Sequence, residues 1–62
     1  MTTTAEYQKA RIAALKVAMD AGLETTIAKD KAHWAAHFAV EGIPSRKDEH
    51  GIYAAARKAI GK

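Results

Sequence analysis

The sequence predicts an all-α protein: a small bundle of three short helices, either complete in itself or completed by dimerisation. Three observations lead to this fold class. Strong helix formers fill almost every segment, and valine and isoleucine never alternate at the period of a strand. Residues typical of helix caps precede the predicted helices, and a glycine follows each of them. The length of 62 residues leaves room for one domain, residues 1–62.

The first helix is predicted over residues 4–21. Thr3 and Glu6 have the spacing of a capping box, and Gly22 can take the left-handed conformation that ends many helices. A helical wheel gathers the large apolar side chains on one stripe that we expect to face the core: Ile12, Leu15 and Met19, with Tyr7 and Ala18 at its edge. A second apolar strip points away from Leu15 and consists of Ala10, Ala13, Ala14 and Val17. This strip is either a lightly apolar surface or a face that packs on a second copy or another protein.

The second helix is predicted over residues 25–41, with Thr25 or Thr26 as its cap and Gly42 as its stop. Its expected core stripe comprises Ile27, Trp34 and Phe38, because large aromatic side chains are usually buried. Small residues form a flank beside Trp34 that would let another helix backbone approach closely: Ala28, Ala32, Ala35 and Ala39.

The third helix is predicted over residues 45–60. Ile43 and Pro44 form an extended corner before it, because proline disfavours helical backbone in the preceding residue. Ser45 and Asp48 fit a capped start, while Gly51 lies inside this helix. The expected core stripe is Ile52, Ala56, Ala59 and Ile60, and Leu23 and Ile43 close the corners of the bundle.

The composition restricts the chemistry that the chain can perform. There is no cysteine, which excludes disulfides, thiolate metal sites and thiol nucleophiles. The only serine, Ser45, is explained as a helix cap, and no glycine-rich phosphate loop occurs. We therefore expect no enzymatic activity and no cofactor. No run of apolar residues approaches a membrane span, and the first residues lack the order of a signal peptide, so we expect a cytoplasmic protein with no membrane partner.

One polar stripe on the second helix contains two histidines four residues apart: Asp30, His33, His37 and Glu41. Such a pair can chelate a divalent ion with a carboxylate as third ligand. Trp34 follows His33, however, where a zinc metalloprotease helix carries its glutamate base. We interpret the stripe as a solvated edge and predict no metal site.

The outer face of the third predicted helix carries the clearest functional pattern: Arg46, Lys47, His50, Tyr53, Arg57 and Lys58. Basic side chains beside an aromatic ring are typical of phosphate contact and base readout. The corner from Gly42 to Ser45 also resembles the turn of a helix-turn-helix unit. Two features depart from that motif: Asp48 stands where a branched apolar residue is usual, and Asp48 and Glu49 would repel phosphates.

These patterns favour a small non-enzymatic protein-interaction module, such as an adaptor or a phage-type inhibitor of a host factor. It would bind a protein partner through the basic face or through Ala13 and Val17 of the first helix. The alternative is a small helix-turn-helix-like DNA-binding regulator that uses the basic face. A net charge of +3 permits either an acidic protein surface or nucleic acid as the partner, and a homodimer is compatible with both.

Overall fold

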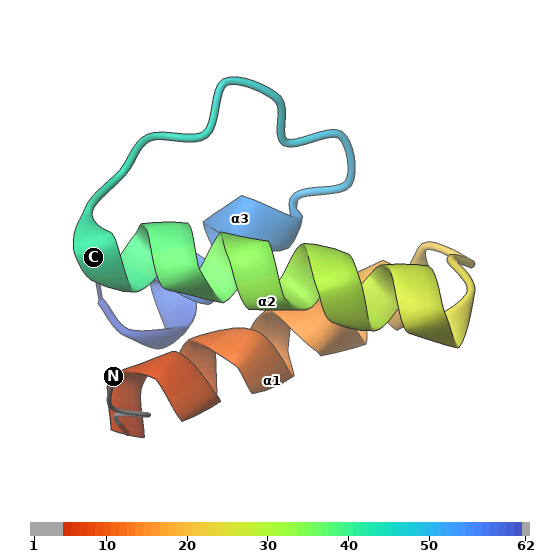
Figure 1. Cartoon of the computed structure of the whole chain (residues 1–62), viewed down its shortest axis with the longest axis horizontal. Helices are drawn as coiled ribbons and strands as arrows, with labels where there is room; N and C mark the ends of the chain where they lie inside the picture. Colours follow the sequence, from red (N-terminus) through yellow and green to blue (C-terminus); the bar gives the residue numbers. More distant parts are fainter. Residues whose placement is uncertain (1–4, 62) are drawn as a thin grey trace.

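The computed structural model describes residues 5–61 and contains three α-helices, with no strand in this range. α1 spans Ala5–Asp20, α2 spans Thr25–Glu41 and α3 spans Ile52–Ala59. α1 and α2 run antiparallel beside each other, α3 lies behind α2, and the segment 42–51 arches from α2 to α3 (Figure 1). Each helix contacts the other two, and the molecule measures 28 × 21 × 17 Å. The predicted all-α bundle is confirmed.

None of the helices between residues 5 and 61 has the length and hydropathy needed to cross a bilayer.

The glycine stops predicted after the first two helices are confirmed. Gly22 and Gly42 adopt left-handed backbone conformations, with φ of +89° and +76°. After each glycine, the next amide donates to a carbonyl five residues earlier, as in a Schellman motif. These bonds run from Leu23 to Ala18 (3.3 Å) and from Ile43 to Phe38 (2.9 Å). The end of α1 at Gly22 lets the chain turn back into α2, and the end of α2 at Gly42 begins the 42–51 segment.

The threonine cap predicted for the second helix is not found. Thr3, the first residue of the expected capping box, lies outside the described residues. At the start of α2, Glu24 occupies the N-cap position without a side-chain hydrogen bond, and Thr25 is already helical. Neither threonine therefore has the predicted role, and the start of α2 depends on its packing against the other helices.

The predicted start of the third helix is wrong by seven residues, because α3 begins at Ile52. The Asp48 side chain does not lie in a first helical turn. Its two carboxylate oxygens accept hydrogen bonds from the backbone amides of Tyr53 (2.9 Å) and Ala54 (3.0 Å). Asp48 therefore caps the start of α3 from a position outside the helix. Gly51 is left-handed, with φ of +72°, which breaks the helical path immediately before Ile52.

The 42–51 segment is irregular but held by side-chain hydrogen bonds. The Tyr53 hydroxyl donates to the Ile43 carbonyl at 2.8 Å and fastens the start of the segment to α3. The Ser45 hydroxyl donates to the Lys47 carbonyl at 3.1 Å. The Tyr53 bond and the Asp48 cap attach the segment to α3 near its two ends, and the Ser45 bond lies within the segment.

The core is built almost entirely from alanine. Its fully or nearly fully buried residues are Ala10, Ala14 and Ala18 of α1, Ala28, Ala32, Ala35, Ala36 and Ala39 of α2, and Ile52 and Ala56 of α3. Six larger side chains pack around this cluster and are partly buried: Tyr7, Leu15, Val17, Leu23, Tyr53 and Ile60. Methyl side chains project little, so the helix axes can approach closely and bring three helices into contact within a short chain.

The core predicted for α1 and α2 is therefore correct only in part: Ala18 is fully buried and Leu15 packs against the core, as expected. Five residues assigned to the core are exposed instead: Ile12 (62 %), Met19 (45 %), Ile27 (44 %), Trp34 (50 %) and Ile43 (42 %). The supposedly spare strip of α1 faces inward, with Ala10 and Ala14 fully buried. On α3 the assignment is correct for Ile52 and Ala56, whereas Ala59 is exposed. The physical reason is that the alanines of α1 and α2 match each other along the helix contact, which turns the bulkier faces outward.

Candidate functional site

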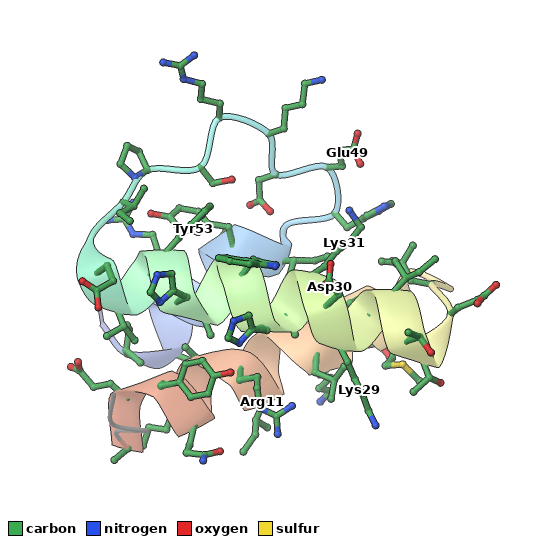
Figure 2. All side chains as sticks on the ribbon, viewed as in Figure 1. Arg11, Lys29, Asp30, Lys31, Glu49 and Tyr53 are labelled. Atoms are coloured by element: carbon green, nitrogen blue, oxygen red, sulfur yellow. The ribbon has the colours of Figure 1, made fainter. Side chains whose placement is uncertain are left out.

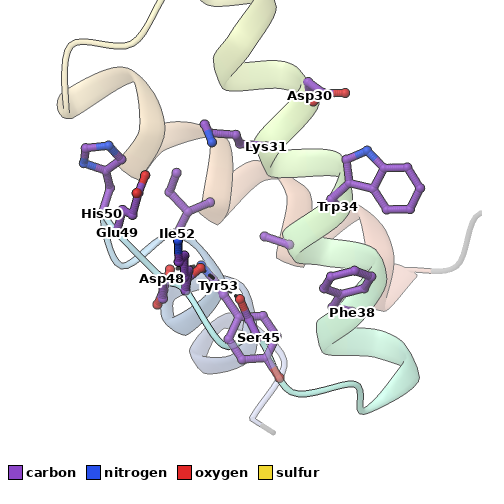
Figure 3. A pocket seen from close by; sticks show the side chains of 12 residues that line it. Asp30, Lys31, Trp34, Phe38, Ser45, Asp48, Glu49, His50, Ile52 and Tyr53 are labelled. Atoms are coloured by element: carbon purple, nitrogen blue, oxygen red, sulfur yellow. Dashed lines mark hydrogen bonds between the residues drawn. The ribbon is translucent and has the colours of Figure 1, made fainter.

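A groove of about 390 Å³ lies between α2 and the 42–51 segment, and we call it the α2 groove (Figure 3). Asp30, Lys31, Trp34 and Phe38 line it from α2. The opposite side comes from the segment and the first turn of α3: Ser45, Lys47, Asp48, Glu49, His50, Ile52 and Tyr53. The hydrogen bonds of Asp48 and Tyr53 that attach the segment to α3 thus also hold the second wall of the groove in place.

The two ends of the α2 groove differ in chemistry. Lys31, Glu49 and His50 lie toward one end, and the rings of Phe38 and Tyr53 lie toward the other (Figure 3). Trp34 stands on the α2 side with half of its surface exposed. A ligand with an apolar body and a charged group would find matching surroundings at the two ends.

Aromatic contacts extend from Trp34 along the outside of α2. The Trp34 ring meets the His33 and His37 rings edge-on, with centroids 5.1 and 5.9 Å away, and lies 6.0 Å from the Phe38 ring. The two imidazoles are nearly parallel, at 11° and 6.4 Å. A 2.7 Å hydrogen bond between the Tyr7 hydroxyl and Nδ1 of His33 joins this row to α1. These contacts restrict the Trp34 ring although much of it is exposed, which suits a binding anchor.

Comparison with protein families, with curated proteins and with solved structures finds no match to this chain. The geometry of its own residues is therefore what supports a functional proposal. Sequence reasoning placed Trp34 and Phe38 in the core and so did not find the α2 groove. The alanine flank of α2 was the signal in the sequence that could have located the groove. Small residues that let another backbone approach mark the buried side of the helix, which leaves Trp34 on the exposed side.

The six residues predicted to share one helix face do not do so. Arg46, Lys47 and His50 belong to the 42–51 segment, and only Tyr53, Arg57 and Lys58 belong to α3. Lys47, His50 and Tyr53 line the α2 groove. The Arg57 guanidinium lies 5.7 Å from the centre of the Tyr53 ring, in the range of a cation–π contact. Figure 2 shows the Tyr53 side chain beneath the arch of the segment.

The predicted helix-turn-helix turn is also absent from the described residues. That motif joins its helices through a turn of three or four residues, whereas the whole 42–51 segment separates α2 from α3. α3 itself has only eight residues. DNA binding as such remains a prediction, but it would use exposed basic side chains without this motif.

The remaining candidate residues have different positions. Ala13 and Val17 are only partly exposed, and Val17 packs against the alanine core. Asp30 and His33 are exposed on α2, and Asp30 also lines the α2 groove. Within residues 5–61, no three histidine or carboxylate side chains are grouped so that they could hold a metal ion.

Proposed function

We propose that this chain is a small protein-interaction module that binds another polypeptide in the α2 groove, with Trp34 as its anchor. The main observation behind this proposal is that Trp34 is 50 % exposed beside a groove, whereas alanine methyl groups fill the core. Tryptophan and tyrosine are enriched among the residues that dominate binding energy, because large rings bury much apolar area at a small cost in side-chain entropy.

The surroundings of Trp34 support this assignment. Phe38 and Tyr53 line the same groove, which also carries charged side chains: Asp30, Lys31, Lys47 and Glu49. Protein-protein interfaces usually combine apolar contacts with polar and charged groups that exclude water from those contacts. A ring exposed alone on a flat surface would need no functional explanation, whereas Trp34 is part of a row of contacting rings beside a groove.

A pull-down from the source cell, comparing the wild-type chain with Trp34→Ala, tests the proposal. Removing an interface anchor costs at least about 2 kcal/mol, which corresponds to roughly a 30-fold loss of affinity. Ile27→Ala is the matched control, because Ile27 is 44 % exposed on the same helix but does not line the groove. We expect the partner to be lost with Trp34→Ala and kept with Ile27→Ala. Equal capture by both variants would contradict the proposal.

DNA binding is the second candidate, favoured by exposed basic residues on the segment and on α3: Arg46, Lys47, Arg57 and Lys58. A binder that neutralises four phosphates loses affinity with salt at a log–log slope of about −3 to −4. Fluorescence anisotropy with labelled duplex DNA measures this slope. Sub-micromolar binding at physiological salt that is abolished by Arg57→Glu and unaffected by Trp34→Ala would favour the DNA-binding function over the protein-interaction function.

A further inference from the structure

We propose that the α2 groove accepts the outer face of α1 from a second copy of this chain, so that copies associate head to tail. The outer face of α1 is defined here by Lys9, Ile12, Lys16 and Met19. This inference rests on the proposed function, because it names an occupant of the same groove.

The outer face of α1 has the pattern of a helix that docks into a groove with both apolar and charged walls. Ile12 is 62 % exposed and Met19 is 45 % exposed. They are seven residues apart, so they lie on one stripe about 10 Å apart along the axis. Lys9 and Lys16 are exposed beside them. Apolar anchors at such spacings, flanked by charges, are how amphipathic helices bind grooves.

The size of the groove suits side-chain insertion. A helix with its side chains is about 10–12 Å wide, so a groove of about 390 Å³ cannot enclose one. It can take apolar side chains from a helix lying across its rim. In the proposed contact, Ile12 and Met19 of one copy enter between Trp34 and Tyr53 of the next.

The charges of the two surfaces are complementary. The groove is lined by three carboxylates (Asp30, Asp48 and Glu49) and two lysines (Lys31 and Lys47), and the charges of these five groups sum to −1. The outer face of α1, with the neighbouring Asp20, carries two lysines and one carboxylate, a net charge of +1. Burial of Ile12 and Met19 provides the stabilisation, and the opposite charges favour this pairing over groove against groove.

The positions of the two surfaces determine the kind of assembly. α1 and the 42–51 segment lie on opposite sides of α2 (Figure 1). A copy that offers its α1 face to a neighbour therefore keeps its own groove open for a third copy. Such a contact is heterologous and extends the assembly, whereas a two-fold dimer would use the same patch on both partners.

The required contact area indicates modest affinity. A standard interface removes about 800 Å² from each partner, close to a fifth of the 4292 Å² surface of this chain. A helix of 16 residues is about 24 Å long and about 10 Å wide, so one of its faces covers less than that. We therefore expect association at about 10–100 μM, near the weak end of specific interfaces.

Sedimentation velocity with two complementary variants tests the pairing. Ile12→Glu destroys the α1 face and leaves the groove intact, and Trp34→Ala does the reverse. Each variant alone should remain monomeric at concentrations where the wild type forms dimers and larger species. An equimolar mixture should form a 1:1 heterodimer that grows no further, because each partner lacks the surface needed for the next contact. Circular dichroism confirms that both variants keep their helices.

Self-association of either variant at the wild-type level, a wild type that stays monomeric at 1 mM, or a mixture that stays monomeric would overturn the head-to-tail pairing. The proposed function fails separately, when Trp34→Ala still captures the foreign partner. A monomeric wild type together with Trp34-dependent capture therefore leaves the proposed function standing and removes only the second copy as occupant.

Discussion

Replacing Ala14 by leucine tests the alanine core. Ala14 is fully buried in the core cluster, so the added carbon atoms must displace the atoms packed around it. Overpacking of this kind costs about 1–3 kcal/mol, and a core of this size supplies only about 3–5 kcal/mol in total. At about 4–8 °C per kcal/mol, the melting temperature should fall by roughly 4–24 °C.

Ile12→Ala is the paired perturbation on the same helix. Full burial of an isoleucine side chain is worth about 1.5–3 kcal/mol, but only a little more than a third of Ile12 is covered. The loss of burial is therefore about 1 kcal/mol at most, and the better helix propensity of alanine offsets part of it. Urea unfolding followed by far-ultraviolet circular dichroism measures both variants. A cost of about 2–5 kcal/mol for Ile12→Ala, the usual range for a buried isoleucine, together with a neutral Ala14→Leu, would refute the alanine core.

Three further predictions concern the 42–51 segment and its attachment to α3. Asp48→Ala removes the acceptor of two backbone amides and should lower the free energy of unfolding, measured in urea, by about 1–2 kcal/mol. The control Glu49→Ala should change it by no more than about 0.5 kcal/mol. Equal costs would argue against the cap. Gly51→Ala forces a side chain into a left-handed conformation and should destabilise the chain by about 1 kcal/mol; a stabilised variant would show that this backbone is not required. Tyr53→Phe removes the bond to the Ile43 carbonyl. It should cost about 0.5–1.5 kcal/mol and speed amide hydrogen exchange in the segment, and unchanged exchange would show that the bond does not restrain it.

The helix ends that the sequence could predict are those decided by local backbone chemistry. Glycine can adopt positive φ without steric cost, so a glycine after a run of helix formers predicts the end of a helix. At Gly22 and Gly42 this local signal was sufficient. The start of α3 was not predictable in the same way. Ser45 and Asp48 have cap spacing, but the Asp48 carboxylate reaches amides five and six residues ahead. That choice depends on Gly51 and on the path of the segment from α2 to α3, which local spacing does not encode.

The side of each helix that faces the core depends on its partners. Apolar patterning assumes that the largest side chains are buried, which led to Ile12 and Trp34 as core residues. α1 instead offers Ala10 and Ala14 at helical spacing, and α2 offers a matching alanine flank. Three short helices in mutual contact bury the faces that allow close approach. The candidate site follows from the same choice, because the α2 groove exists only when Trp34 faces outward.

The alanine core also determines how the stability of this chain varies with temperature. Unfolding raises the heat capacity by about 0.45 cal/K/mol for each Å² of apolar surface newly exposed to water. Alanine methyls such as that of Ala14 contribute little apolar area, and Ile12 and Trp34 already expose half or more of their surface in the folded state. The heat-capacity change should therefore fall below the usual 12–15 cal/mol/K per residue. The free energy of unfolding then follows a shallow curve, with little loss on cooling and a broad transition on heating.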